Sequence, residues 1–222
     1  MIQGSSPAVA PKVKPLMRGV LHEAAFFVAL VVGVLLVIYA NGTRASTAAA
    51  VFAGSVALML GASSLYHRVD WSVRVRPWMR RIDHAGIYLL IAGTYTPVGL
   101  LTLRGSMREV VLGIVWGGAV LAIAMKFLWV GSPKWLSAVT GLALGWAGVA
   151  AMPQVAHYAG ATAVILLAIG GLAYTVGAVV YALRRPDPVP AVFGYHELFH
   201  ALTIVAVTCQ YVAIAFFVVK VG

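Results

Sequence analysis

The sequence predicts an all-α integral membrane protein: a bundle of seven transmembrane helices with the N-terminus in the cytoplasm and the C-terminus outside. Three observations predict this class. Hydrophobic residues make up 62% of the 222 residues and charged residues only 10%, which leaves too little polar surface to cover a water-soluble globule. The apolar residues form seven long runs, and the basic residues gather in alternate connections between those runs.

Each apolar run is long enough to cross the hydrocarbon as a helix, which takes about 20 residues (range roughly 17 to 25). Transmembrane strands would be shorter and would alternate in polarity, and these runs do neither. The first run is also longer than the apolar core of a signal peptide, roughly 7 to 15 residues, so we interpret it as a span. The seven expected spans are Val20–Tyr39, Ala48–Tyr66, Ile82–Leu103, Val110–Val130, Leu136–Met152, Ala159–Leu183 and Val192–Val219.

The distribution of basic residues sets the expected orientation. With the N-terminus inside, twelve of the sixteen Lys and Arg residues lie on the cytoplasmic side, as the positive-inside rule requires. The four expected outside are Arg44, Arg104, Arg108 and Lys220. Although the net charge is +10, the basic residues form no single face or stripe of the kind that binds nucleic acid. We therefore expect membrane lipids, and no nucleic acid, as partners.

The chain divides into a short tail and one membrane domain. Residues 1–15, MIQGSSPAVAPKVKP, contain three prolines and few large apolar side chains, which is typical of a flexible cytoplasmic tail. Residues 16–222 form the seven-helix transmembrane domain. Within it, the pairs Gly113/Gly117 and Gly141/Gly145 place small residues on one helix face, a pattern that favours close helix packing.

The stretch GYHELFH, residues 194–200, contains the most specific chemical pattern. His196 and His200 are four residues apart, so they share one helix face and suit two nitrogens of one tetrahedral metal site. The letters also match the HExxH pattern of zinc proteases, which draw their third ligand from further along the chain. No His, Asp or Glu follows His200. An intramembrane protease is therefore disfavoured, and a third ligand must come from upstream.

Two upstream residues are candidates for that third ligand, His67 and Asp83. The predicted topology brings both to the membrane face where the seventh span begins. Ser63 lies one helical turn before His67, where its hydroxyl could bond a metal-bound water or a carboxylate. Three imidazoles with an open fourth position are typical of catalytic zinc, and Asp83 would then accept or hold a proton of the water. Imidazole also suits iron, copper and nickel, so the spacing leaves the metal open.

The other ionisable residues of the spans are interpreted more simply. Glu197 lies about 100° around the helix from His196. We expect it either to contact and orient the metal ligands without binding the metal itself, or to face the lipid interface. His84 is expected to be structural, and His157 to be solvated in an external loop, MPQVAHYAG. The pattern assigns no role to His22 or Glu23.

Three segments together resemble the hemolysin III family, the bacterial branch of the progestin and adiponectin receptor superfamily. They are SSLYHRVDW (63–71), RIDHAGIYLLIAGTYTP (81–97) and GYHELFH (194–200). The resemblance implies a multi-pass protein of the bacterial cell (inner) membrane with a zinc ion near the cytoplasmic side. It implies His67, His196 and His200 as ligands, with Asp83 and Ser63 around a metal-bound water. The segment RGVLHEA (18–24) departs from the family pattern: it keeps His22 but lacks an acidic residue and an asparagine before it, for which Glu23 is a candidate substitute.

Three functions are compatible with these residues. The leading hypothesis is a zinc-dependent hydrolase of a lipid amide or ester, because the resemblance links the family to membrane hydrolases of the ceramidase kind. The second is a non-enzymatic protein of membrane homeostasis or lipid sensing in which zinc is structural. The third, which the family name suggests, is a cytolytic pore-former. We rank it last because so few charges within the spans offer no water-filled path.

Overall fold

The computed structural model describes residues 14–129 and 133–221, so most of the expected tail, residues 1–13, lies outside the described residues. The expected all-α class is confirmed: the described part is helical, and its one isolated β-bridge joins Val189 to Phe193. The α-helices of this part are α1 (Val20–Tyr39), α2 (Thr43–Arg68), α3 (Arg76–Pro97), α4 (Gly105–Leu128), α5 (Lys134–Trp146), α6 (Met152–Leu183) and α7 (Tyr195–Ala213).

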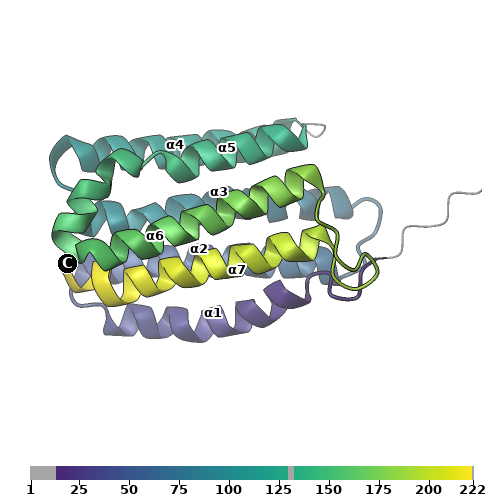
Figure 1. Ribbon diagram of the computed structural model, residues 1–222, viewed down its shortest axis with the longest axis horizontal. Helices are drawn as coiled ribbons and strands as arrows, with labels where there is room; N and C mark the ends of the chain where they lie inside the picture. Colours follow the sequence, from purple (N-terminus) through teal and green to yellow (C-terminus); the bar gives the residue numbers. More distant parts are fainter. Residues whose placement is uncertain (1–13, 130–132, 222) are drawn as a thin grey trace, which may run out of the picture.

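The helices run alternately up and down the long axis of the molecule (Figure 1). Each packs against the next one in the chain, and α1 contacts α7, which closes the bundle into a ring. Wider π-helical turns extend α3 through Val98–Thr102 and α7 through Ile214–Val218. Because of the alternation, the end of α2 and the starts of α1, α3 and α7 meet at one end of the ring, which we call the histidine end.

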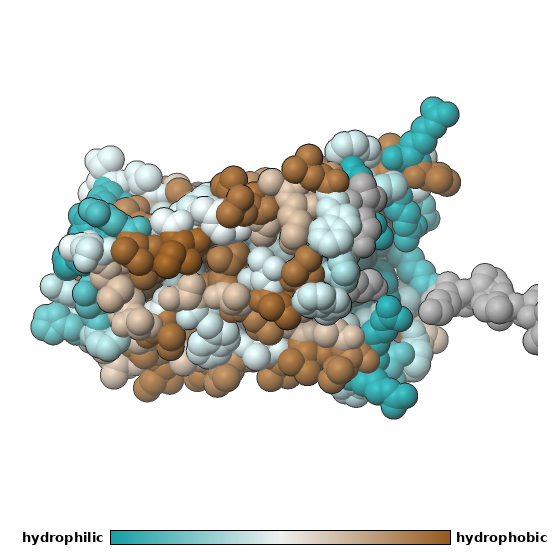
Figure 2. Space-filling view, turned by 90° about the horizontal axis from the view of Figure 1, so that it is seen from above, coloured by the Kyte–Doolittle hydropathy of each residue, from teal (hydrophilic) through white to brown (hydrophobic). Residues whose placement is uncertain are grey.

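The surface of the bundle is that of a membrane protein. Figure 2 shows side chains of mostly apolar and weakly polar character over the middle, with hydrophilic residues concentrated toward the two ends. Within the described residues, six helical segments are long and apolar enough to cross a membrane. One of these, Trp135–Leu183, spans 49 residues and contains both α5 and α6. The chain is therefore a multi-pass membrane protein, while the count of seven spans and the cytoplasmic N-terminus stay predictions.

Two helices begin earlier than the expected spans, because the polar residues that precede the apolar runs are also helical. α2 begins at Thr43 instead of Ala48, and α3 begins at Arg76 instead of Ile82.

The expectation that His157 lies in a loop is wrong, because residues 152–159 form the first part of α6. Proline near the start of α6 suits the first helical turn, where no amide partner is needed. The break comes at Gly160, whose φ of 85° interrupts the helix.

The closest helix contacts are not at the glycine pairs that the sequence indicated. A Cβ atom at Gly113, Gly117, Gly141 or Gly145 would meet no atom within 4 Å, so the packing role expected for these pairs is wrong. The close approach is instead between α2 and α3, where a Cβ on Gly93 would lie 2.0 Å from Ser55 Oγ. This contact fixes α3 against α2 and so helps to set the positions of Asp83 and His67 at the histidine end.

Candidate metal site

Three histidines from two helices meet at the histidine end of the bundle. His67 comes from the last turn of α2, and His196 and His200 come from the first turns of α7. One ring nitrogen from each lies within 4.8 Å of the others. His67 and His200 are buried, with 7% and 2% of their surface exposed. The structure thus brings together the three imidazoles that the sequence singled out.

The donor set fits a metal ion. His67 Nε2 and His196 Nε2 are 3.1 Å apart, and two nitrogens bound at about 2.0–2.1 Å to a tetrahedral ion would lie about 3.3 Å apart. Histidines four residues apart on α7 point the same way, and α2 supplies the third from across the ring. These three residues could bind a metal ion, and their nitrogens suit several transition metals.

Asp83 lies beside the histidines, about two turns into α3. Its Oδ2 is 4.0 Å from His67 Nε2 and 3.4 Å from His84 Nδ1. His84 Nδ1 is also 2.7 Å from the carbonyl oxygen of Arg80, so His84 contacts the carboxylate and the helix backbone at once. A carboxylate next to a metal-ligating imidazole can orient that ring or accept a proton near the ion. The roles of both residues stay predictions.

Ser63 has a partner that the sequence did not indicate. Its Oγ lies 2.9 Å from His22 Nδ1, and both groups are buried. The ring of His22 stacks on the ring of His200, with centroids 3.8 Å apart and planes 6° apart. His22 Nε2 is buried without a hydrogen-bond partner in the described part of the chain. Through this histidine, α1 joins the site, although the pattern had assigned His22 no role.

Glu197 does not face lipid. Its side chain is 1% exposed, forms an ion pair with Arg18 Nε, and accepts a hydrogen bond from the Gly194 amide at 2.9 Å. It therefore caps the start of α7 and holds the histidine-bearing turn in place. Glu23, the candidate substitute for the missing acidic residue, instead pairs with Arg68 at 2.7 Å on the exposed outer side.

A short segment before α1 holds the histidine end together. The amides of Leu16 and Met17 donate to the carbonyl oxygens of Ala191 and Val192, at 3.0 and 3.1 Å. Two residues later Gly19 adopts a left-handed conformation, with φ of 82°, directly against α2. A Cβ at this position would lie 2.7 Å from the Cβ of His67. Glycine is thus required both by the backbone and by the neighbouring ligand.

We expect Gly19→Ala to lower the stability and the metal affinity of the protein together. The left-handed backbone costs about 1–2 kcal/mol with a Cβ, and the contact with His67 adds about 1–3 kcal/mol of overpacking. Gly42→Ala is the control for the metal site, because Gly42 also has a positive φ of 81° but no atom within 4 Å of the new Cβ. Its ψ of 155° differs from the −12° of Gly19, so only the metal affinities of the two variants are compared. Thermal unfolding and metal titration check the Gly19→Ala protein, and an equal loss of metal affinity in the two variants would contradict the contact with His67.

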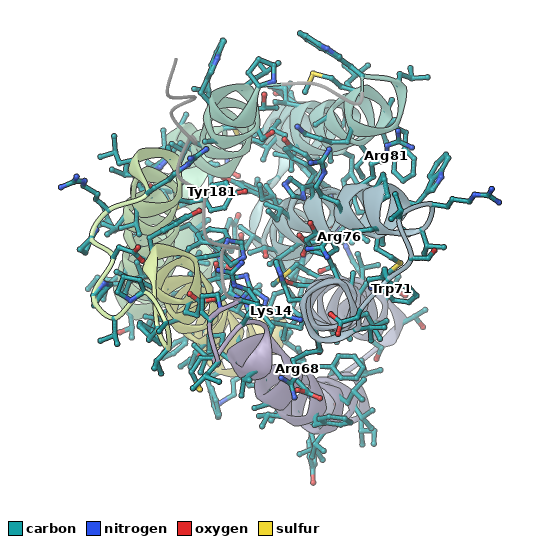
Figure 3. All side chains as sticks on the ribbon, turned by 90° about the vertical axis from the view of Figure 1, so that its right-hand side faces the viewer. Lys14, Arg68, Trp71, Arg76, Arg81 and Tyr181 are labelled. Carbon is teal, nitrogen blue, oxygen red and sulfur yellow. The ribbon has the colours of Figure 1, made fainter. Side chains whose placement is uncertain are left out.

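The histidines open into a cavity of about 520 Å³ inside the ring. Its wall includes Ser63, Asp83 and the three histidines at one end, and it continues between the helices to Thr94 and Gln210. In Figure 3, which looks onto the histidine end, Tyr181 of α6 and Arg76 of α3 lie on opposite sides of the central space. A cavity of this volume lies within the usual size range of small-molecule sites, roughly 300–1,000 Å³.

Fold and site together define a multi-pass helical membrane protein with three histidines that could hold a metal ion at one end of the bundle. A family model described as "Haemolysin-III related" matches residues 11–211. The match covers most of the chain, and the chain belongs to this family.

Two curated relatives support the same assignment. The chain is 32% identical over 172 residues to the "Hemolysin-3 homolog" of Bacillus subtilis (strain 168), which covers 77% of each chain. It is also 32% identical over 155 residues to "Hemolysin-3" of Bacillus cereus, which covers 68% of this chain and 70% of that protein.

Proposed function

We propose that the protein is a zinc-dependent hydrolase of a lipid amide or ester, acting from within a bacterial cell membrane near its cytoplasmic face. The observation that carries this proposal is the shared cavity: the histidines, Asp83 and Ser63 line the same space. A reactive centre at the mouth of an intramembrane cavity suits a substrate whose polar linkage lies near the bilayer surface. The two Bacillus relatives support the bacterial setting.

The depth of the cavity suits an apolar chain. Its wall runs from His200 to Gln210 along α7, ten residues or about 15 Å of helix. Leu90, Ile91 and Leu142 contribute apolar surface to the same wall. An acyl chain in this space would keep its carbonyl at the histidine end, where the polar residues are.

Each polar residue then has a defined task. His67, His196 and His200 would hold the zinc ion, which when bound polarises a carbonyl and makes water more acidic. The carboxylate of Asp83, within 4.0 Å of His67, takes the proton of the attacking water and returns it to the leaving group. Ser63, held by His22, orients the nucleophile through its hydroxyl. Glu197 and Arg18 keep the first turn of α7 in position.

Purified, zinc-loaded protein is expected to release fatty acid from at least one class of lipid amide or ester, as measured by mass spectrometry of a lipid panel. Removing the metal with a chelator should abolish release, because the three nitrogens alone cannot polarise a carbonyl. Adding zinc back should restore it. Absence of product from every lipid class with one zinc bound per chain would overturn the proposal.

Structural zinc in a lipid sensor is the second candidate. It is favoured by the fact that the histidines join α2 to α7, so one ion could clamp two helices distant in sequence. The same chelation experiment separates the two, since a clamp predicts loss of thermal stability without any turnover. Cytolysis, which the names of the relatives suggest, ranks last because charged residues within the spans are few and gather at one end of the bundle.

A further inference from the structure

The mouth of the cavity is strongly basic. Five cationic side chains line the same space as the histidines: Arg18, Arg76, Arg80, Arg81 and Lys126. Among the lining residues that the structure describes, Asp83 is the one carboxylate. Even with Glu197, which pairs with Arg18 just behind the wall, the positive charges exceed the negative ones by three. Such an excess in a concave site attracts anions.

The three arginines of α3 bring positive charge to the mouth of the cavity. Within residues 14–129 and 133–221, no carboxylate forms an ion pair with Arg76, Arg80 or Arg81. The guanidinium of Arg81 lies 4.4 Å from the ring centre of Trp78, and its Nε is buried without a hydrogen-bond partner. A buried donor of this kind normally has an acceptor. Figure 3 shows Arg76 beside the central space, with Arg81 further out along the α3 side.

Lys126 adds a cation that the positive-inside rule does not explain. Residues that serve topology alone lie in exposed loops, as Arg74, Arg184 and Arg185 do at this end. Lys126 is only 7% exposed and donates to Ser137 Oγ across the gap between α4 and α5. Lys126 therefore adds a positive charge to the wall of the cavity, away from the exposed loops.

The order of groups along the cavity matches one class of lipid. Arg76 and Arg80 precede Asp83 on α3 by seven and three residues, so they lie about 10 Å and 5 Å nearer the end of the bundle. From the mouth of the cavity inward, the cationic residues therefore come first, then the histidines, and then the apolar wall. A phosphoglyceride presents the matching order of phosphate, ester carbonyl and acyl chain. The planar guanidinium of arginine can donate two parallel hydrogen bonds to two oxygens of one phosphate.

We propose that the basic residues of the cavity mouth bind the phosphate head group of an anionic lipid, with Arg76, Arg80 and Arg81 as its main donors. This deepens the proposed function, because it names the substrate class of the same cavity. It does not depend on turnover, since the head group is bound whether or not a linkage is cleaved.

Binding of short-chain phosphatidic acid to the Asp83→Asn protein, in zwitterionic detergent, tests the proposal by calorimetry without hydrolysis. We expect phosphatidic acid to bind at least about tenfold more tightly than diacylglycerol of the same chain length. The double variant R76Q/R80Q should lose most of that preference. The matched control R74Q/R185Q removes two exposed arginines from the same end and should keep it.

Four results would overturn the proposal. They are equal binding of the two lipids, an unchanged preference in R76Q/R80Q, an equal loss in the control variant, and binding of inorganic phosphate as tight as that of phosphatidic acid. The last would assign the mouth to a free anion. Both substituted arginines are exposed, so an unchanged thermal midpoint is expected in each variant. Selective binding in a protein that hydrolyses no lipid would refute the proposed function alone.

Discussion

Replacing His67 with alanine is expected to reduce metal affinity at least about 100-fold and to leave purified protein without bound zinc. The change removes one of three nitrogens that lie within 4.8 Å of one another. Loss of residues that merely orient a ligand already costs about 10–100-fold in affinity, so loss of a ligand should cost more. Elemental analysis and competitive titration against a chelator of known affinity measure the effect.

His157→Ala is the control for this experiment. His157 lies on the first part of α6 and contacts the ring of Tyr158, far from the cluster in the fold. It should bind metal as the wild type does. If the His67→Ala protein folded normally and still bound one zinc with unchanged affinity, the three histidines would not be the metal ligands.

Asp83→Asn is expected to lower lipid hydrolysis by about 10²–10⁴-fold while the metal stays bound. The amide has the size of the carboxylate but cannot accept the proton of water at neutral pH. Because Oδ2 is 4.0 Å from His67 Nε2, beyond hydrogen-bond distance, we expect the three histidine nitrogens to keep their arrangement in this variant. Turnover is measured by released fatty acid, and metal content by elemental analysis of the same sample.

Asp70→Asn is the matched substitution, since Asp70 is exposed near the same end and pairs loosely with Lys14 at 3.6 Å. It should leave both turnover and metal content unchanged. Full activity of Asp83→Asn would assign the proton transfer to another group. Loss of zinc together with activity would instead indicate that Asp83 orients the ligands.

The helices and the pair His196/His200 could be predicted from the sequence because both depend on local pattern, whereas His67 was chosen over Asp83 as the third ligand only by the resemblance to the family. Apolar run length is set by the bilayer, and a four-residue spacing fixes one helix face whatever surrounds it. The predicted helix ends were less accurate, because residues such as Arg76 and Thr43 are polar yet helical. Hydropathy detects the membrane core and not the turns that extend beyond it.

The partners of His22 and Glu197 could not be predicted, because they depend on how helices are rotated against one another. His22 stacks on His200 and reaches Ser63, and no spacing within α1 indicates either contact. The available signals were an imidazole at the start of an apolar run and the retention of His22 in the segment RGVLHEA. Likewise, the pairing of Glu197 with Arg18 joins residues 179 positions apart, beyond the reach of any periodic pattern.

That long-range pairing has a consequence for biogenesis. Arg18 and His22 emerge from the ribosome early, but Glu197, His196 and His200 follow only with the final helix. During synthesis, Arg18 therefore lacks its carboxylate partner, and His22 lacks the ring on which it stacks, until the final helix is made. A nascent chain halted before residue 195 lacks α7, the helix that closes the ring between α6 and α1, and so cannot form this ion pair.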